Sequence, residues 1–108
     1  MAIAYTVLGQ SAPLATTLTT LFTASTDTVC SSIVVCNRSA TATSFRVAVR
    51  PAGAAISNEH YIYYDVTIPG NDTFIATVGI TLEATDVVSV YNTLATLSFN
   101  LYGSEITP

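Results

Sequence analysis

The stretch Ser44-Phe45-Arg46-Val47-Ala48-Val49-Arg50 decides the fold class of this chain. Its apolar residues share one face of an extended backbone: Phe45, Val47 and Val49. The opposite face carries Arg46, Ala48 and Arg50. Side chains of a strand point alternately to opposite faces, so this pattern predicts a strand with one face in a core. Pro51 and Gly53 follow and are residue types that end strands.

The same alternation recurs along the chain. Residues 61–68 predict a strand with these residues facing the core: Ile62, Tyr64, Val66 and Ile68. Its outer face is predicted to carry Tyr61, Tyr63, Asp65 and Thr67. Pro69-Gly70-Asn71-Asp72 predicts a tight turn. Further strands are indicated at 28–37, 73–78, 86–91 and 97–102, with weaker candidates at 5–8 and 18–23.

These segments give about seven or eight short strands, separated by turn signals roughly every ten residues. No segment has the apolar spacing of a helix. For 108 residues this pattern predicts one all-β domain, an antiparallel β-sandwich. Both an immunoglobulin-like and a jelly-roll topology are compatible with it. Residues 1–13 are a candidate extended N-terminal arm that docks onto a neighbour.

The composition favours a protein that works in an assembly. Half of the residues are hydrophobic, only 9% are charged, and lysine is absent. An average soluble domain is about 25% charged. Threonine, the commonest residue, instead supplies a wettable but uncharged surface. Such a surface is expected where neighbouring subunits cover much of it, although a monomer with an uncharged polar coat has the same composition.

Several classes of partner are disfavoured. The net charge is −4, and the three basic residues are too few for a phosphate-binding surface, so we expect no nucleic acid. No apolar run reaches the 18–20 residues of a membrane-spanning helix, so we expect no membrane partner. The N-terminus lacks the basic segment of a signal peptide, which favours an intracellular origin.

Cys30 and Cys36 are predicted to be free thiols. Six residues of one strand span about 20 Å, far beyond the reach of a disulfide. Their even separation predicts that both lie on the same face and are buried as small hydrophobes. Their spacing does not suit a metal clip.

The titratable residues do not form a catalytic set, so we expect neither an enzyme nor a cofactor. His60 is the sole histidine, and no nucleophile elbow accompanies it. The seven acidic residues are scattered, and Asp72 and Asp86 occupy positions where turns need side-chain hydrogen bonds. A calcium site that includes Glu83 is the less favoured alternative, because the spacing of a calcium-binding loop is absent.

Three groups of residues are candidates for an interface. Tyr61 and Tyr63 stand two apart on one predicted face, where they suit either contact with a partner or packing over a sheet edge. The arginines Arg38, Arg46 and Arg50 are each expected to pair with a carboxylate, within the subunit or across an interface. The N-terminal segment adds Tyr5 and Leu8.

Five stretches together resemble small virion proteins of tailed bacteriophages and cyanophages. They are residues 31–39 (SSIVVCNRS), 45–49 (FRVAV), 60–65 (HYIYYD), 71–74 (NDTF) and 103–106 (GSEI). The resemblance covers nearly the whole chain and implies a β-sandwich subunit of a virus particle. It implies no catalytic residue, and it leaves open whether the subunit belongs to the head or to the tail.

Two functions follow as hypotheses. The first is a virion structural subunit, either a capsid cement or decoration protein or a subunit of the tail, baseplate or fibre. Its expected partners are other virion proteins, such as the major capsid protein, and further copies of itself in a dimer or trimer. The second is a β-sandwich module that binds a host glycan or receptor through Tyr61, Tyr63 and nearby loops.

Overall fold

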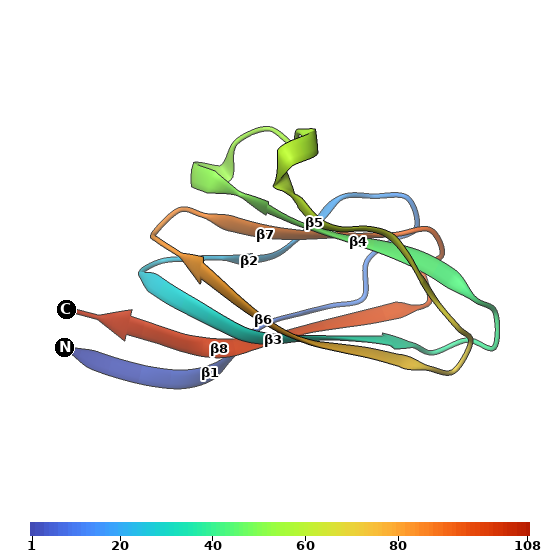
Figure 1. The fold of residues 1–108 in the computed structure, drawn as a ribbon, viewed down its shortest axis with the longest axis horizontal. Helices are drawn as coiled ribbons and strands as arrows, with labels where there is room; N and C mark the ends of the chain where they lie inside the picture. Colours follow the sequence, from blue (N-terminus) through green and yellow to red (C-terminus); the bar gives the residue numbers. More distant parts are fainter.

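The computed structural model describes residues 1–108, which form eight β-strands and two short 3-10 helices (Figure 1). The strands are β1 (Ala2–Ser11), β2 (Thr19–Thr23), β3 (Asp27–Asn37), β4 (Thr43–Arg50), β5 (Tyr61–Ile68), β6 (Thr73–Leu82), β7 (Val87–Asn92) and β8 (Leu97–Thr107). The helices are η1 (Pro51–Gly53) and η2 (Asn58–His60), which lie between β4 and β5.

The strands form two four-stranded antiparallel sheets, in the orders β1-β8-β3-β6 and β2-β7-β4-β5. The first strand pairs with the last, the second with the second to last, and so on inward: β1 with β8, β2 with β7, β3 with β6 and β4 with β5. This is one long hairpin folded over itself, which is the topology of a jelly roll. The predicted antiparallel sandwich is confirmed, and the topology selects the second of its two variants.

The core lies between the two sheets, where fourteen buried residues form one cluster. Phe45 of β4 and Phe99 of β8 meet at its centre, edge to face, with ring centroids 6.0 Å apart. Phe74 of β6 packs against Phe45 at 5.2 Å. The alternation read from residues 44–50 therefore places Phe45 and Val47 in the core as predicted, and both are fully buried. These contacts join the two sheets.

The connection β4–β5 is the one link between consecutive strands that stays within a sheet. The β5–β6 link is the predicted turn at residues 69–72, and it takes the chain from one sheet to the other. There the Asn71 N–H donates to the Ser39 carbonyl at 2.7 Å, and Asn71 has a φ of 53°. Asn is among the few residues that tolerate this left-handed conformation.

A bulge in β3 overturns the predicted placement of the two cysteines. The pairing register of β3 shifts between Cys30 and Ser32 against both neighbouring strands. An extra residue reverses the side-chain alternation beyond it. Cys30 is consequently buried in the core, whereas Cys36 lies half-buried on the outer face of its sheet. Both are free thiols, as predicted, but they do not share a face.

Bulges in β5 overturn the predicted faces of two tyrosines. The register against β4 shifts on either side of Val47, and Asp65 has a φ of 52°. Tyr63 therefore packs onto the core, with its ring 5.3 Å from that of Phe74. Tyr64, which the alternation placed in the core, is 57% exposed.

The N-terminal residues are a strand and not a free arm. Residues 2–11 pair with β8 along their whole length, interrupted by a bulge at Leu8. Leu8 packs against the core, so it is not part of an exposed interface. The weaker candidate strand at 5–8 is thus the middle of a longer one. Figure 1 shows the two chain ends side by side at one end of the sandwich.

Candidate functional site

The two sheets present two outer faces, and these differ in chemistry. We call the outer face of β2-β7-β4-β5 the covered face, because part of it lies beneath the segment 51–60. We call the outer face of β1-β8-β3-β6 the open face, because Figure 1 shows no segment of the chain lying across it.

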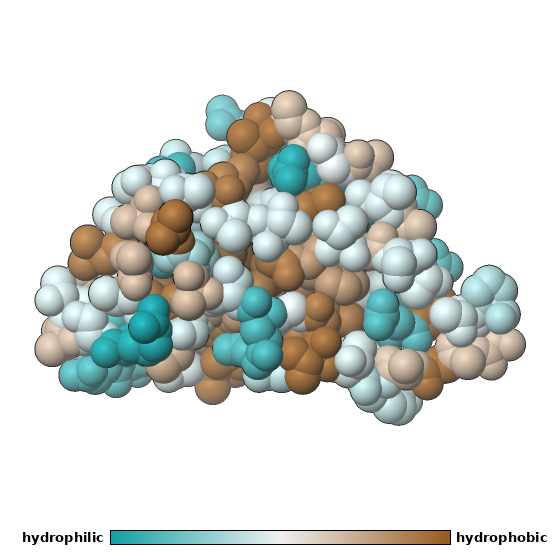
Figure 2. Space-filling model, turned by 180° about the vertical axis from the view of Figure 1, so that it is seen from behind, coloured by the Kyte–Doolittle hydropathy of each residue, from teal (hydrophilic) through white to brown (hydrophobic).

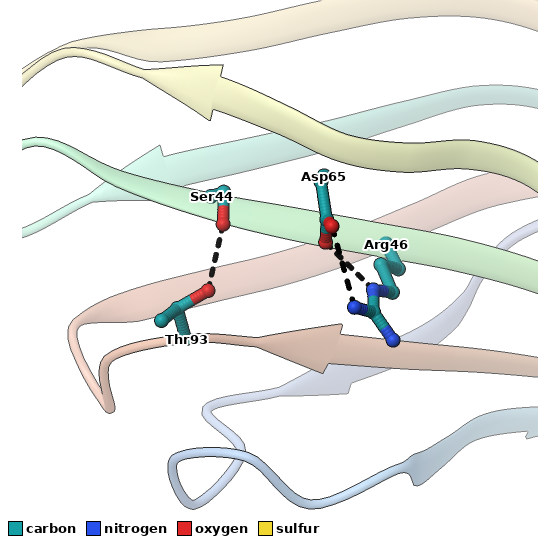
Figure 3. A network of polar contacts seen from close by, with 4 residues as sticks. All are labelled: Ser44, Arg46, Asp65 and Thr93. Carbon is teal, nitrogen blue, oxygen red and sulfur yellow. Dashed lines mark hydrogen bonds and ion pairs between the residues drawn. The ribbon is translucent and has the colours of Figure 1, made fainter.

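Arg46 is the centre of a polar cluster on the covered face. Its Nε donates to Asp65 Oδ1 at 2.7 Å and Nη2 donates to Oδ2 at 3.3 Å, across the β4–β5 pair (Figure 3). The guanidinium carbon lies 4.1 Å from the ring centroid of Tyr64 and 4.6 Å from that of Tyr91. The hydrogen bond to Asp65 raises the pKa of Arg46 above its ordinary value. Arg46 is thus held by both charge and aromatic contact.

The segment 51–60 occupies the rest of the covered face. Figure 1 shows η1 and η2 above β4 and β7, and Ala48 and Ser89, paired on this face, are fully buried. Arg50 fixes the segment, because it donates to Ser89 Oγ at 3.1 Å and to the Ala54 carbonyl at 2.9 Å. This arginine therefore serves the fold by holding a loop.

The expectation that each arginine pairs with a carboxylate holds within the subunit for Arg46 alone. Arg50 contacts a hydroxyl and backbone carbonyls. Arg38 is exposed and donates to the Ala95 carbonyl at 3.2 Å. Whether Arg38 meets a carboxylate of a neighbour remains a prediction.

The tyrosines do not form the predicted pair of Tyr61 and Tyr63. Tyr61 instead packs edge to face against Tyr64, with ring centroids 4.9 Å apart. Tyr64 is stacked by Arg46 as well. The aromatic residues of this face thus contact one another and Arg46, and they do not form a row of free rings.

The open face is built of rows of side chains that run across its strands, and all but one of these rows are uncharged. Cross-strand neighbours point to the same side, so the pairing register defines each row. Two of the rows are Val7–Tyr102–Ser32–Thr77 and Gln10–Asn100–Val34–Ile75. A third is Tyr5–Ser104–Val29–Thr81. The only charged residue in the register of this face is Asp27, at the end of the row that begins with Ile3.

Several large apolar side chains of the open face are exposed. Tyr5 is 86% exposed, Ile75 69%, Val7 50% and Ile3 49%. Figure 2 views the sandwich from behind relative to Figure 1, with the open face along its lower border, and shows separate teal residues scattered among white and brown ones. Of these four residues the sequence singled out only Tyr5. The sequence also held a signal that Ile75 is exposed, because this isoleucine alternates with threonines on the outward-facing positions of residues 73–78.

The titratable residues outside these faces serve local structure. Asp86 accepts from the Ala52 N–H at 2.9 Å and from the Glu83 N–H at 3.0 Å. Asp72 accepts from the Thr73 N–H at 2.8 Å, so both aspartates have the predicted role in turns. His60 Nδ1 accepts from the Ser57 N–H at 3.1 Å.

No three residues among His, Cys, Asp and Glu come together where they could hold a metal ion. Neither of the two three-residue helices has the length or apolarity needed to span a bilayer.

The two thiols differ in environment. Burial raises the pKa of Cys30 to about 11, because the thiolate would lack solvation in the core. Cys36 lies on the open face beside Ser98 and Thr73. Only Cys36 is therefore placed to react with a reagent in solution.

Comparison with known proteins returned no match: no family model, no curated protein and no solved structure is significantly similar to this chain.

Proposed function

We propose that this chain is a structural subunit of a phage virion and not an enzyme. In this proposal it is a capsid cement or decoration protein, or a subunit associated with the tail, baseplate or fibre. Its partners are other virion proteins, and it is made in the host cytoplasm. The observation that carries the proposal is the open face, whose rows carry no charge apart from Asp27 and whose Tyr5 and Ile75 side chains are more than two-thirds exposed.

The open face suits permanent contact with another protein. Burial of an apolar side chain contributes a free energy of about 25 cal/mol per Å², and a side chain that remains exposed to water does not obtain it. The chain has ten charged residues, and the register of the open face includes one of them, Asp27. Charged residues are depleted in the cores of protein interfaces, as they are here.

The topology is compatible with this role and does not decide it. Jelly rolls serve as viral capsid domains, as lectins and as cupin enzymes, so function has to be argued from the surface. The resemblance of five stretches to phage virion proteins supports the first use. In this setting the open face docks onto the shell or tube protein, and the covered face points away from that contact.

The glycan- or receptor-binding alternative is less well supported. It relied on Tyr61 and Tyr63 as neighbouring exposed rings, and Tyr63 packs onto the core. Tyr64 is exposed, but Arg46 stacks on it and is itself paired with Asp65. A sugar-binding platform needs a ring face that is free to stack, which this cluster offers less readily.

The test is to locate the protein in purified particles of the phage that encodes it. Mass spectrometry should find the chain in the particles, and a reconstruction should show its density with the open face against a neighbouring protein. Density on the head supports the cement role, and density on the tail supports the tail role. Absence of the chain from purified particles would overturn the proposal.

A further inference from the structure

The sandwich has four edge strands, and three of them are poorly suited to pair with another chain. β2 has five residues and a bulge, and β5 carries its bulges and Asp65. β6 is broken at Val78 and Gly79, where two residues oppose one of β3, and the charged Asp72 precedes it. Short strands, bulges and charges are the features by which proteins block edge-to-edge pairing.

β1 is the exception. Its residues 2–7 pair with β8 in unbroken register, and they include no charge, proline or glycine. Every second residue of an edge strand points its N–H and C=O groups away from the sheet. Five of these six residues are exposed, so their backbone is not screened by other parts of the chain. The segment is an open template for strand addition.

We propose that β1 pairs antiparallel with β1 of a second copy, so that two open faces join in one continuous eight-stranded sheet. A two-fold axis through Tyr5 places Tyr5 opposite Tyr5 of the second copy and Ile3 opposite its Val7. All of these residues lie on the open face, so that apolar side chains meet apolar ones across the new strand pair.

The absence of charge in residues 2–7 also favours a second copy of the chain as the partner of β1. Each chain has a net charge of −4, yet residues 2–7 carry none, so two copies meet without like charges in the new ladder. The nearest acidic residue is Glu105 on β8, which is opposite Ala4 and shares the core-facing side with buried Thr28. It therefore lies on the other side of the sheet from Tyr5.

The length of the ladder sets the strength of the pairing. Six residues extend about 20 Å. This contact is smaller than a standard interface, so the isolated chain forms a dimer with a dissociation constant in the micromolar range or above. The pairing concerns the purified chain alone, and it holds or fails independently of the proposed function.

The test uses a cysteine at the two-fold axis in a Cys36→Ser background, where Cys30 stays buried. Opposed residues in an antiparallel pair have Cα atoms about 4.5–5.5 Å apart, which a disulfide can bridge, whereas stacked sheets are about 10 Å apart. Tyr5→Cys should form a disulfide-linked dimer under mild oxidation. Ile75→Cys, on the opposite edge of the same face, is the matched control and should cross-link at least about tenfold more slowly.

Backbone hydrogen exchange supplies the second readout. Alternate amides of residues 2–7 should exchange more slowly at high protein concentration than at low concentration, because they donate to the second copy. Tyr5→Lys should abolish this protection, because like charges would face each other across the axis. The proposal is overturned if Tyr5→Cys and Ile75→Cys cross-link equally, if neither does, or if exchange at residues 2–7 is independent of concentration.

Discussion

The two outer faces of the sandwich are built from similar strands but differ in the contacts that their side chains make. On the covered face, Arg46 is paired with Asp65 and stacked on Tyr64, and Arg50 holds a loop over Ser89. On the open face, Ile75 and Tyr5 have no such contacts and remain exposed. Substitutions on the covered face should therefore cost stability, whereas those on the open face should cost binding.

The largest difference is expected in the reactivity of the two thiols. At pH 8 only about one Cys30 in a thousand is a thiolate, since its pKa is about 11 and the residue is fully buried. Cys36 on the open face should react with iodoacetamide about a hundredfold faster or more, as followed by mass spectrometry of the folded protein. In urea both should react at similar rates. Equal labelling of the folded protein would contradict the bulge in β3.

The raised pKa of Cys30 also predicts how stability depends on pH. The thiol ionises at a lower pH in the unfolded chain than in the folded one, so the unfolded state releases its proton first. The contribution of Cys30 is complete below its unfolded pKa and is lost as pH rises toward 11. Cys30→Ala should flatten this alkaline decline in urea titrations. If stability declined with pH at the same slope in Cys30→Ala, the alkaline decline would come from other titratable groups.

The next largest effect is predicted for Gly103 on β8, opposite the bulge of β3. A Cβ added there would collide with the Val29 carbonyl oxygen. Gly103→Ala should therefore lower the free energy of unfolding by about 3 kcal/mol, measured by urea denaturation. Gly79→Ala is the control, because a Cβ there meets nothing within 4 Å and only its φ of 59° is unfavourable. It should cost about 1 kcal/mol. A smaller loss at Gly103 than at Gly79 would refute the close packing of β8 on β3.

A smaller effect is predicted for the polar cluster of the covered face. Arg46→Ala should cost about 1–2 kcal/mol in urea denaturation, because the change removes a bidentate ion pair and two aromatic contacts. Arg38→Ala removes one exposed hydrogen bond and should cost less than about 0.5 kcal/mol. Equal costs would show that the cluster has no structural role.

The smallest effect on stability is predicted for the open face. Ile75→Thr should change the free energy of unfolding by less than about 0.5 kcal/mol, because the side chain is already 69% exposed. The same variant should bind particles that lack the protein more weakly than the unchanged chain does. Val35→Thr, which alters a fully buried residue of the neighbouring strand β3, should instead destabilise the fold. Normal particle binding by Ile75→Thr would argue against the open face as the interface.

The alternation of apolar residues was sufficient to predict the sandwich, because strands such as 44–50 keep one face in the core throughout. It failed where a strand contains a bulge. Cys36 and Tyr64 are each displaced to the other face by an extra residue in the strand. Ser31 and Asp65 lie at these bulges, and neither residue type predicts a bulge. The open face was missed for a related reason, since its rows are defined by the register between strands distant in sequence.

The most direct test of the two-face account is hydroxyl-radical footprinting of the chain, free and within purified particles. The account predicts that oxidation of Tyr5 and Ile75 falls strongly in the particle, while that of Tyr64 on the covered face stays as in the free protein. Protection of Tyr64 with unchanged oxidation of Tyr5 and Ile75 would contradict it and would make the covered face the one that binds.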